Sequence, residues 1–156
     1  MDQLSISDSL NSKSRIIASS GVFKIELLKN VGELDYPQLI EISKSLAKDY
    51  GEKAILTKST IQKYFNTAGA LPFIARYRDN IIGYIIGVPL ETLNQEPWAR
   101  TDENFGKANT LYTYAFVIQS EFKGNGYAKM LKRVFLSWAG KQENISFITG
   151  HVANGI

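Results

Sequence analysis

The residues with the clearest chemical potential form a glycine-containing turn from Phe122 to Ala128, between an expected strand end and an expected helix start. Its glycines, Gly124 and Gly126, allow a tight turn that exposes successive backbone N–H groups, and the first N–H groups of the helix point the same way. A helix N-terminus of this kind binds anions, and Lys123 adds a positive charge beside it. The turn therefore predicts a cradle for a phosphate or pyrophosphate.

Two common phosphate-binding motifs fit this turn poorly. A Walker loop needs a lysine after its last glycine, whereas Tyr127 follows Gly126. A dinucleotide-binding fingerprint needs a third glycine where Lys129 stands and an acidic residue at the end of the next strand, but Glu143 precedes its strand. An ordinary glycine-capped strand-to-helix turn remains as the structural alternative.

A longer run around the turn, Phe116 to Leu131, reads FVIQSEFKGNGYAKML and resembles the acetyl-CoA signature of the GNAT superfamily of N-acyltransferases. In that signature an Arg or Gln, two residues, a Gly, one residue and a Gly or Ala follow a strand. Here Lys123, Gly126 and Ala128 take the three defined places. The lysine keeps the positive charge but lacks the planar guanidinium fork. The resemblance implies acetyl-CoA as cosubstrate, with no metal.

The elements expected along the chain agree with this resemblance. From Val22 the hydrophobic periodicity predicts strand, helix, helix, strand, strand, strand, helix and strand. The expected ranges are a strand over 22–27, helices over 35–51 and from about 59, a hairpin over 71–77 and 81–88, a strand over 110–119, a helix over 127–140 and a strand over 145–152. We expect an α/β (α+β) fold with a mixed, mostly antiparallel sheet flanked by helices, similar to acyl-CoA N-acyltransferases.

The resemblance also implies where the cofactor lies. In the family, the signature strand and the strand after the signature helix splay apart, and the pantetheine arm occupies the gap. The pyrophosphate then rests on the N–H groups of the turn. The expected cofactor-binding residues are Phe116, Val117, Ile118, Lys123, Gly124, Asn125, Gly126, Tyr127, Ala128, Lys129 and Asn154.

The catalytic groups are less clearly marked. Several family members place a glutamate base near the position of Tyr112, and tyrosine is a poor base because its usual pKa is near 10. Tyr112 and Tyr114 project on the same strand face, where either could hold a relay water or simply pack. His151, the one histidine, either titrates beside the splay or hydrogen-bonds a neighbour. A long connection over 91–109 contacts the acceptor or is a solvated loop; its candidates are Glu96, Trp98, Arg100, Asp102 and Glu103.

Composition narrows the class of protein. With 156 residues, 44% hydrophobic and 21% charged, the chain fits one globular domain. The absence of cysteine excludes disulfides, thiolate metal sites and cysteine nucleophiles, and no apolar run is long enough for a membrane helix. A net charge of +3 with dispersed basic residues disfavours a nucleic-acid partner. We expect a cytoplasmic protein with a flexible, serine-rich segment over 1–20 and the acetyltransferase domain over 21–156.

The end of the chain departs from the family pattern. Family members usually continue past this strand with a helix that carries a tyrosine acid, and then a strand pair, so we expect a domain lacking those elements. An exposed last strand favours a homodimer through that edge. The leading function is an acetyl-CoA-dependent N-acetyltransferase acting on a primary amine of a small molecule or peptide. The alternative is a CoA-binding or regulatory module of the same fold without turnover.

Overall fold

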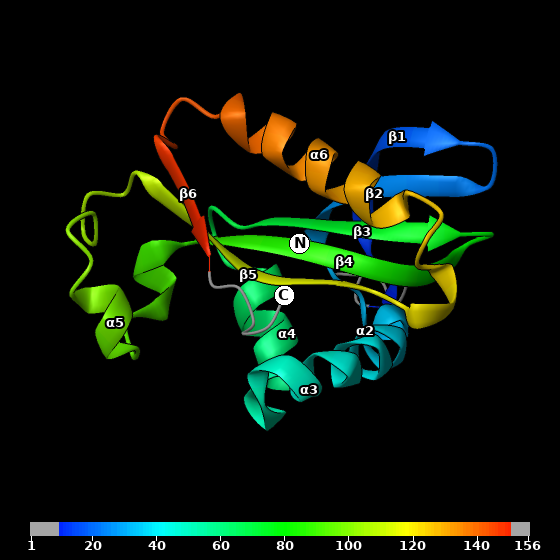
Figure 1. Cartoon of the computed structure of the whole chain (residues 1–156), viewed down its shortest axis with the longest axis horizontal. Coiled ribbons are helices and arrows are strands. Elements are labelled where there is room, and N and C mark those ends of the chain that lie inside the picture. Colours follow the sequence, from blue (N-terminus) through cyan, green and yellow to red (C-terminus); the bar gives the residue numbers. More distant parts are fainter. Residues whose placement is uncertain (1–9, 151–156) are drawn as a thin grey trace, which may run out of the picture.

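A single sheet of six strands, in the order β1-β2-β3-β4-β5-β6, forms the centre of the computed structural model, which describes residues 10–150 (Figure 1). The strands are β1 (Lys13–Ser20), β2 (Phe23–Asn30), β3 (Leu71–Tyr77), β4 (Asn80–Pro89), β5 (Thr110–Ile118) and β6 (Phe147–Gly150). Neighbouring strands are antiparallel up to β5, whereas β5 and β6 are parallel. The expected mixed, mostly antiparallel sheet is confirmed.

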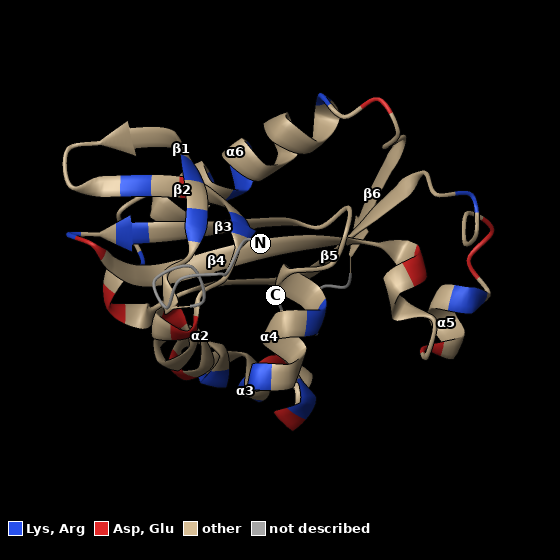
Figure 2. Ribbon diagram, turned by 180° about the vertical axis from the view of Figure 1, so that it is seen from behind, with Lys and Arg blue, Asp and Glu red and all other residues tan. Residues whose placement is uncertain are grey.

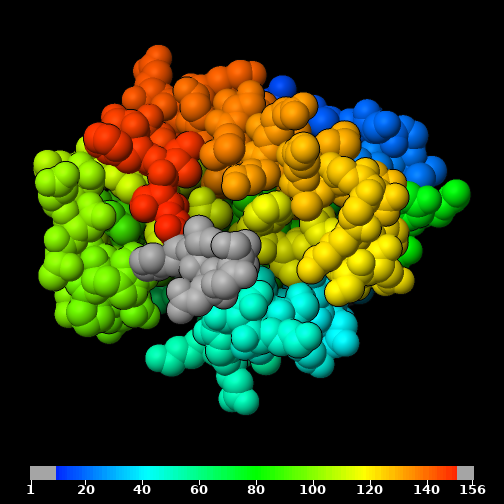
Figure 3. Space-filling model, viewed as in Figure 1, coloured from blue at the N-terminus to red at the C-terminus, as the bar shows by residue number. Residues whose placement is uncertain are grey.

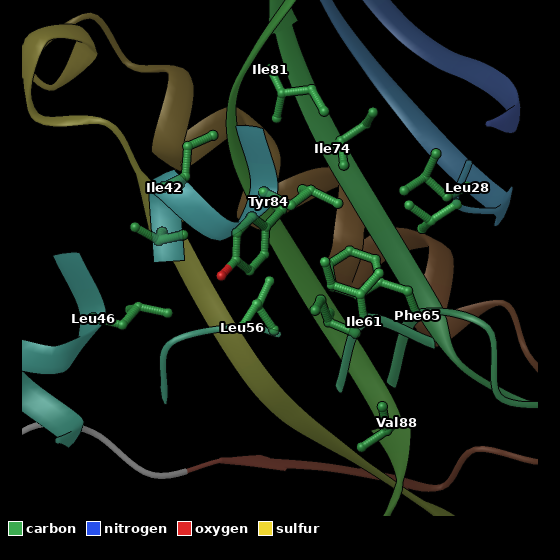
Figure 4. Close-up of a cluster of buried hydrophobic side chains, with 14 of the residues drawn as sticks. Leu28, Ile42, Leu46, Leu56, Ile61, Phe65, Ile74, Ile81, Tyr84 and Val88 are labelled. Atoms are coloured by element: carbon green, nitrogen blue, oxygen red, sulfur yellow. The ribbon is translucent and has the colours of Figure 1, made fainter. Parts of the chain in front are cut away.

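Helices cover both faces of this sheet (Figure 1). The α-helices are α2 (Tyr36–Ser43), α3 (Ala47–Tyr50), α4 (Lys58–Phe65), α5 (Pro97–Arg100) and α6 (Tyr127–Gly140). Short 3-10 turns join them: η1 (Glu33–Asp35), η2 (Lys44–Leu46), η3 (Glu52–Ala54), η4 (Leu90–Leu93) and η5 (Ser120–Phe122). One buried cluster, the α2–α4 core, lies between the sheet and the layer that contains α2 and α4 (Figure 4). A second cluster, the α6 core, lies under α6.

The first helix is shorter than its periodicity predicts. Asp35 and Pro37 open it as expected, but the range to Gly51 divides into α2, η2 and α3. At the division the Ser43 hydroxyl donates to the Ile40 carbonyl oxygen at 2.6 Å, and the Ser45 hydroxyl donates to the carbonyl of the preceding turn at 3.0 Å. Serine hydroxyls that bond back to the helix backbone in this way compete with regular helix geometry.

The N-terminal segment differs from the expectation. Residues 1–20 were expected to be flexible, but Lys13–Ser20 forms β1 and pairs antiparallel with β2. Two of the serines that suggested flexibility instead bond to other segments. The Ser14 hydroxyl donates to Glu26 Oε1 at 2.8 Å, and the Ser12 hydroxyl donates to Asp35 Oδ2 at 2.6 Å. The prediction of flexibility is therefore wrong for β1, and residues 1–9 lie outside the described part.

The final strand begins two residues later than its expected range over 145–152, and residues 151 and 152 of that range lie outside the described part. The structure gives β6 as four residues, all exposed. His151 and Asn154 lie outside the described residues, so their expected roles stay predictions. Within residues 10–150 no helix has the length and apolar character needed to cross a membrane.

Candidate active site

The turn between β5 and α6 has the geometry of an anion cradle. Lys123 is extended, Gly124 has a φ of +88°, and Gly126, with a φ of +80°, is the N-cap of α6 without any side-chain cap. The Met130 N–H donates to the Gly126 carbonyl at 3.0 Å, so the N–H groups before it have no partner within the helix. A Cβ at either glycine would meet no atom within 4 Å. The backbone here is therefore open to a ligand.

Aromatic packing fixes this cradle to the sheet. The Tyr127 ring stacks on Phe23 of β2, with ring centroids 4.2 Å apart and an angle of 11° between the planes. The ring centroid of Phe122 lies 5.2 Å from that of Tyr77 at the end of β3. Because the Tyr127 side chain packs against β2, its available group toward an anion is the backbone N–H. Lys123, Asn125 and Lys129 have exposed side chains around the same backbone.

The outer edge of β5 leads directly to the cradle. β4 pairs with β5 as far as Ile118, and β6 pairs with β5 over Thr110 to Thr113, which is opposite Gly150, the last described residue. Within residues 10–150 no strand pairs with the outer edge of β5 from Tyr114 to Ile118. Figure 3 shows part of β5 visible between α6 and the layer of α2, α3 and α4. The structure thus brings the expected pantetheine-contacting residues, Phe116, Val117 and Ile118, into one line with the cradle.

Tyr112 is opposite Thr149 of β6, and Tyr114 follows the last described pair of the two strands, Thr113 and Gly150. Both project on the face that packs against the α2–α4 core, as predicted. The ring centroids of Tyr112 and Trp98 are 5.1 Å apart, and the Tyr114 ring stacks on the Tyr64 ring with 4.1 Å between the centroids. Both tyrosines therefore have aromatic packing partners and lie near the end of the described pairing between β5 and β6.

The surroundings keep both hydroxyls protonated at neutral pH. Burial, with smaller contributions from Tyr50 and the Glu96 carboxylate, raises the pKa of Tyr112 from 10.0 to about 12. Burial also raises the pKa of Tyr114 well above its usual value, and Tyr64 and Glu96 act in the same direction. A phenolate base is therefore disfavoured at neutral pH, whereas a neutral hydroxyl can donate a hydrogen bond or orient water.

The candidates on the long connection separate into two groups. The connection folds as η4 and α5, with Leu93 and Ala99 buried beneath it. Arg100 Nη1 donates to the Asn94 carbonyl at 3.0 Å, and Asp102 Oδ1 accepts from the Asn104 N–H at 2.8 Å, so both side chains bond the connection itself. Trp98 instead packs against Tyr112 of β5, and the negative charge of Glu96 contributes to the raised pKa values of Tyr112 and Tyr114.

Sequence reasoning missed two neighbours of these tyrosines. The sequence suggested a role at the site for neither Tyr64 nor Tyr50. Tyr64 stacks directly on Tyr114, and Tyr50 lies close enough to Tyr112 to influence its pKa. No local spacing in the sequence links these residues, since they come from elements that meet only in the folded chain.

The chain matches the acetyltransferase (GNAT) family over residues 38–155. It belongs to this family. The match includes the signature strand, the turn and α6, so the resemblance seen in the sequence is confirmed. No curated protein matches the chain.

Solved structures share the acyl-CoA N-acyltransferase fold of this GNAT chain. A ribosomal-protein-alanine N-acetyltransferase from Brucella melitensis biovar Abortus 2308 is 17% identical, with a TM-score of 0.56 over 85% of this chain and 82% of the other. An aminoglycoside acetyltransferase from an uncultured soil metagenomic sample, in complex with sisomicin, is 18% identical, with a TM-score of 0.59 over 86% and 80%. Aminoglycoside N-acetyltransferase AAC(6')-Iy, in complex with CoA, is 13% identical, with a TM-score of 0.59 over 91% and 80%.

Proposed function

We propose that this GNAT protein is an acetyl-CoA-dependent N-acetyltransferase that acts on a primary amine of a small molecule or peptide. The observation that carries the proposal is the continuity between the outer edge of β5 and the uncapped N-terminus of α6. A similar structure that holds CoA supports the choice of cosubstrate.

In the proposed complex, backbone N–H groups from Gly124 to Lys129 bind the pyrophosphate, because they lead into an uncapped helix start and a Cβ at Gly124 or Gly126 would meet no atom within 4 Å. The Lys123 N–H already donates to the Ser120 carbonyl at 3.2 Å. The Lys123 ammonium adds a charge-assisted contact. Backbone groups of Phe116, Val117 and Ile118 on the outer edge of β5 bind the pantetheine arm. Asn154 remains a proposed contact outside the described residues.

Acetyl transfer then takes place beside Tyr112 and Tyr114. The neutral amine nitrogen attacks the thioester carbonyl carbon, the C–N bond forms and the C–S bond breaks. The nitrogen loses a proton, and the departing thiolate gains one. Because their pKa values are raised, we propose that the two tyrosines stay protonated and act as hydrogen-bond donors to a relay water or to the reacting groups.

The second candidate function is CoA binding without turnover. It is favoured by one observation: neither Tyr112 nor Tyr114 of β5 is suited to act as a base at neutral pH, because the pKa of each is raised. Calorimetry with acetyl-CoA and a thiol-release assay over a panel of amines separate the two. Binding with thiol release supports the transferase, binding without release on any amine supports the second function, and absence of binding contradicts both.

Two substitutions test the cradle. Lys123→Ala is expected to weaken CoA binding by about 1 to 3 kcal/mol, because a charge-assisted contact is lost. Gly126→Val is expected to weaken it further, since a φ of +80° strains a β-branched residue and displaces the N–H groups. Calorimetry with CoA measures both variants.

The matched control is Lys29→Ala, which removes the same charge from an exposed site. Lys29 lies near the opposite end of β2 from Phe23, the residue that touches the cradle, and six strand residues span roughly 20 Å. We expect CoA affinity close to that of the parent. Parental affinity in a folded Gly126→Val protein would show that the cradle is assigned wrongly.

A further inference from the structure

The turn before α6 contains an exposed asparagine followed by glycine, Asn125 and Gly126. Within residues 10–150 the Asn125 side chain makes one hydrogen bond, from its Nδ2 to the Phe122 carbonyl at 3.3 Å. This bond is longer than a typical amide hydrogen bond and lies at the protein surface, so water competes for it. A Cβ at Gly126 would meet no atom within 4 Å, so there is open space around the next residue as well.

The backbone nitrogen of Gly126 is placed to react with the Asn125 amide. No group in the described part of the chain accepts the Gly126 N–H. Asparagine side chains fold back onto the backbone that follows them, and glycine carries no side chain that blocks this approach. The Gly126 nitrogen is therefore accessible to the Asn125 side-chain carbon, Cγ.

Positive charge around Gly126 favours the reactive form of its nitrogen. Gly126 is the N-cap of α6, a helix of 14 residues, and the helix dipole places partial positive charge at this end. Figure 2 shows Lys and Arg but no Asp or Glu on α6, in agreement with its sequence. The electrostatic field that suits a phosphate therefore also stabilises a deprotonated Gly126 nitrogen and the oxyanion that forms when it attacks.

We propose that Asn125 deamidates spontaneously in the CoA-free protein. The Gly126 nitrogen loses its proton to solvent and attacks Asn125 Cγ. A new N–C bond forms, and the side-chain amide group takes up a proton and leaves as ammonia. Water then adds to either carbonyl carbon of the resulting succinimide ring and opens it to aspartate or isoaspartate. The overall change consumes water, releases ammonia and replaces a neutral amide by a carboxylate.

The effect on the cradle rests on the CoA binding proposed above. The new carboxylate lies one residue before the N-cap, where it repels the pyrophosphate and competes for the same N–H groups. Isoaspartate also lengthens the backbone and displaces the Gly126 N–H. Bound CoA opposes the reaction, because its phosphate occupies that N–H and its negative charge disfavours loss of the proton. Deamidation therefore closes the cofactor site of the free protein and spares the loaded protein.

Asn144 provides a matched control within the same chain. It is also exposed, but Ile145 follows it, and the Ile145 N–H donates to the Gln142 carbonyl at 3.2 Å. The branched side chain blocks the approach, and the nitrogen is already bonded. Asn144 lies beyond the far end of α6, and 14 helical residues span roughly 21 Å. We therefore expect Asn144 to keep its amide and a charge there to leave the cradle unaffected.

Peptide mapping by mass spectrometry tests the modification without any turnover. The folded protein is incubated at mildly alkaline pH with and without CoA, and fragment ions assign each conversion to one asparagine. We expect conversion at Asn125 and none at Asn144, faster as the pH rises. CoA at about ten times its Kd should slow conversion about tenfold, because only the free fraction reacts. Asn125→Gln, whose longer side chain cyclises less readily, should keep its own starting CoA affinity throughout the incubation.

Calorimetry with CoA tests the consequence directly. Asn125→Asp should lower CoA affinity at least about tenfold, whereas Asn144→Asp, which adds the same charge at the far end of α6, should bind as the parent does. An intact Asn125 in the folded free protein, or equal conversion at Asn144, overturns the modification. Unchanged affinity in Asn125→Asp overturns its effect on the cradle. Conversion of Asn125 in a protein that binds no CoA supports the modification and overturns the transferase alone.

Discussion

At the scale of single residues, the Tyr84 hydroxyl stands out in the α2–α4 core. It is fully buried, and among the described residues it has no hydrogen-bond partner. Figure 4 shows it pointing among Ile42, Leu46 and Leu56. The Ser43 hydroxyl, which lowers the Tyr84 pKa slightly, already donates to one backbone carbonyl and accepts from one N–H, and burial outweighs it and raises that pKa well above 10.0.

We therefore expect Tyr84→Phe to be neutral or to stabilise the fold by up to about 1 kcal/mol, because a buried polar group without a partner is removed and the ring is kept. Tyr84→Ala, which removes the ring as well, should destabilise by about 3 to 5 kcal/mol. Urea unfolding followed by circular dichroism measures both variants. A loss of more than about 1 kcal/mol in Tyr84→Phe would show that the hydroxyl has a partner in solution, such as a buried water.

At the scale of elements, Arg76 of β3 connects three segments. Its guanidinium pairs with Glu26 of β2 and with Asp35 of η1, both at 3.1 Å, and these side chains are 10% to 17% exposed. The same carboxylates accept the Ser14 and Ser12 hydroxyls that hold β1. Arg76→Met is therefore expected to cost about 2 to 4 kcal/mol, since it leaves two largely buried carboxylates without their cation.

The exposed ion pair between Lys44 and Glu41, at 2.9 Å, provides the control, and Lys44→Met should change the free energy of unfolding by less than about 1 kcal/mol. Urea unfolding compares the two variants, and amide exchange in β1 should accelerate only in Arg76→Met. Unchanged stability and exchange in Arg76→Met would mean that β1 is held by its backbone pairing with β2 alone.

The same network shows what the sequence could and could not predict. The turn from Lys123 to Gly126, the hairpin of β3 and β4, and α6 were predictable because local residue types determine them. β1 was missed because the serines in and before it suggested a flexible N-terminal segment, and the role of Ser12 and Ser14 depends on Asp35 and Glu26, which are distant in sequence. The contacts of Tyr112 with Trp98 and of Tyr114 with Tyr64 were likewise not predictable, since periodicity assigns each ring to a face but does not say which faces meet.

At the scale of the whole molecule, the two edges of the sheet differ in how they resist association. β1 carries Lys13 and Arg15, and its pairing with β2 has two register shifts, which are common devices against edge-to-edge pairing. β6 has the sequence FITG without a charge, and Phe147 and Ile148 are 51% and 38% exposed. We therefore propose that association between copies of the chain takes place through β6 rather than β1.

Sedimentation velocity over a range of concentrations tests this homodimer. The parent should sediment as a dimer at high concentration, and Ile148→Lys should shift it toward monomer, because a charge on the edge strand costs free energy when a second strand covers it. Ser19→Lys places the same charge on the exposed end of β1 and should leave the dimer unchanged. A parent that stays a folded monomer at all concentrations, or equal dissociation by both lysines, would contradict pairing through β6. Because β6 pairs with β5 beside Tyr112, dimer formation through β6 should also change the KM for the amine, which kinetics across the same concentrations would detect.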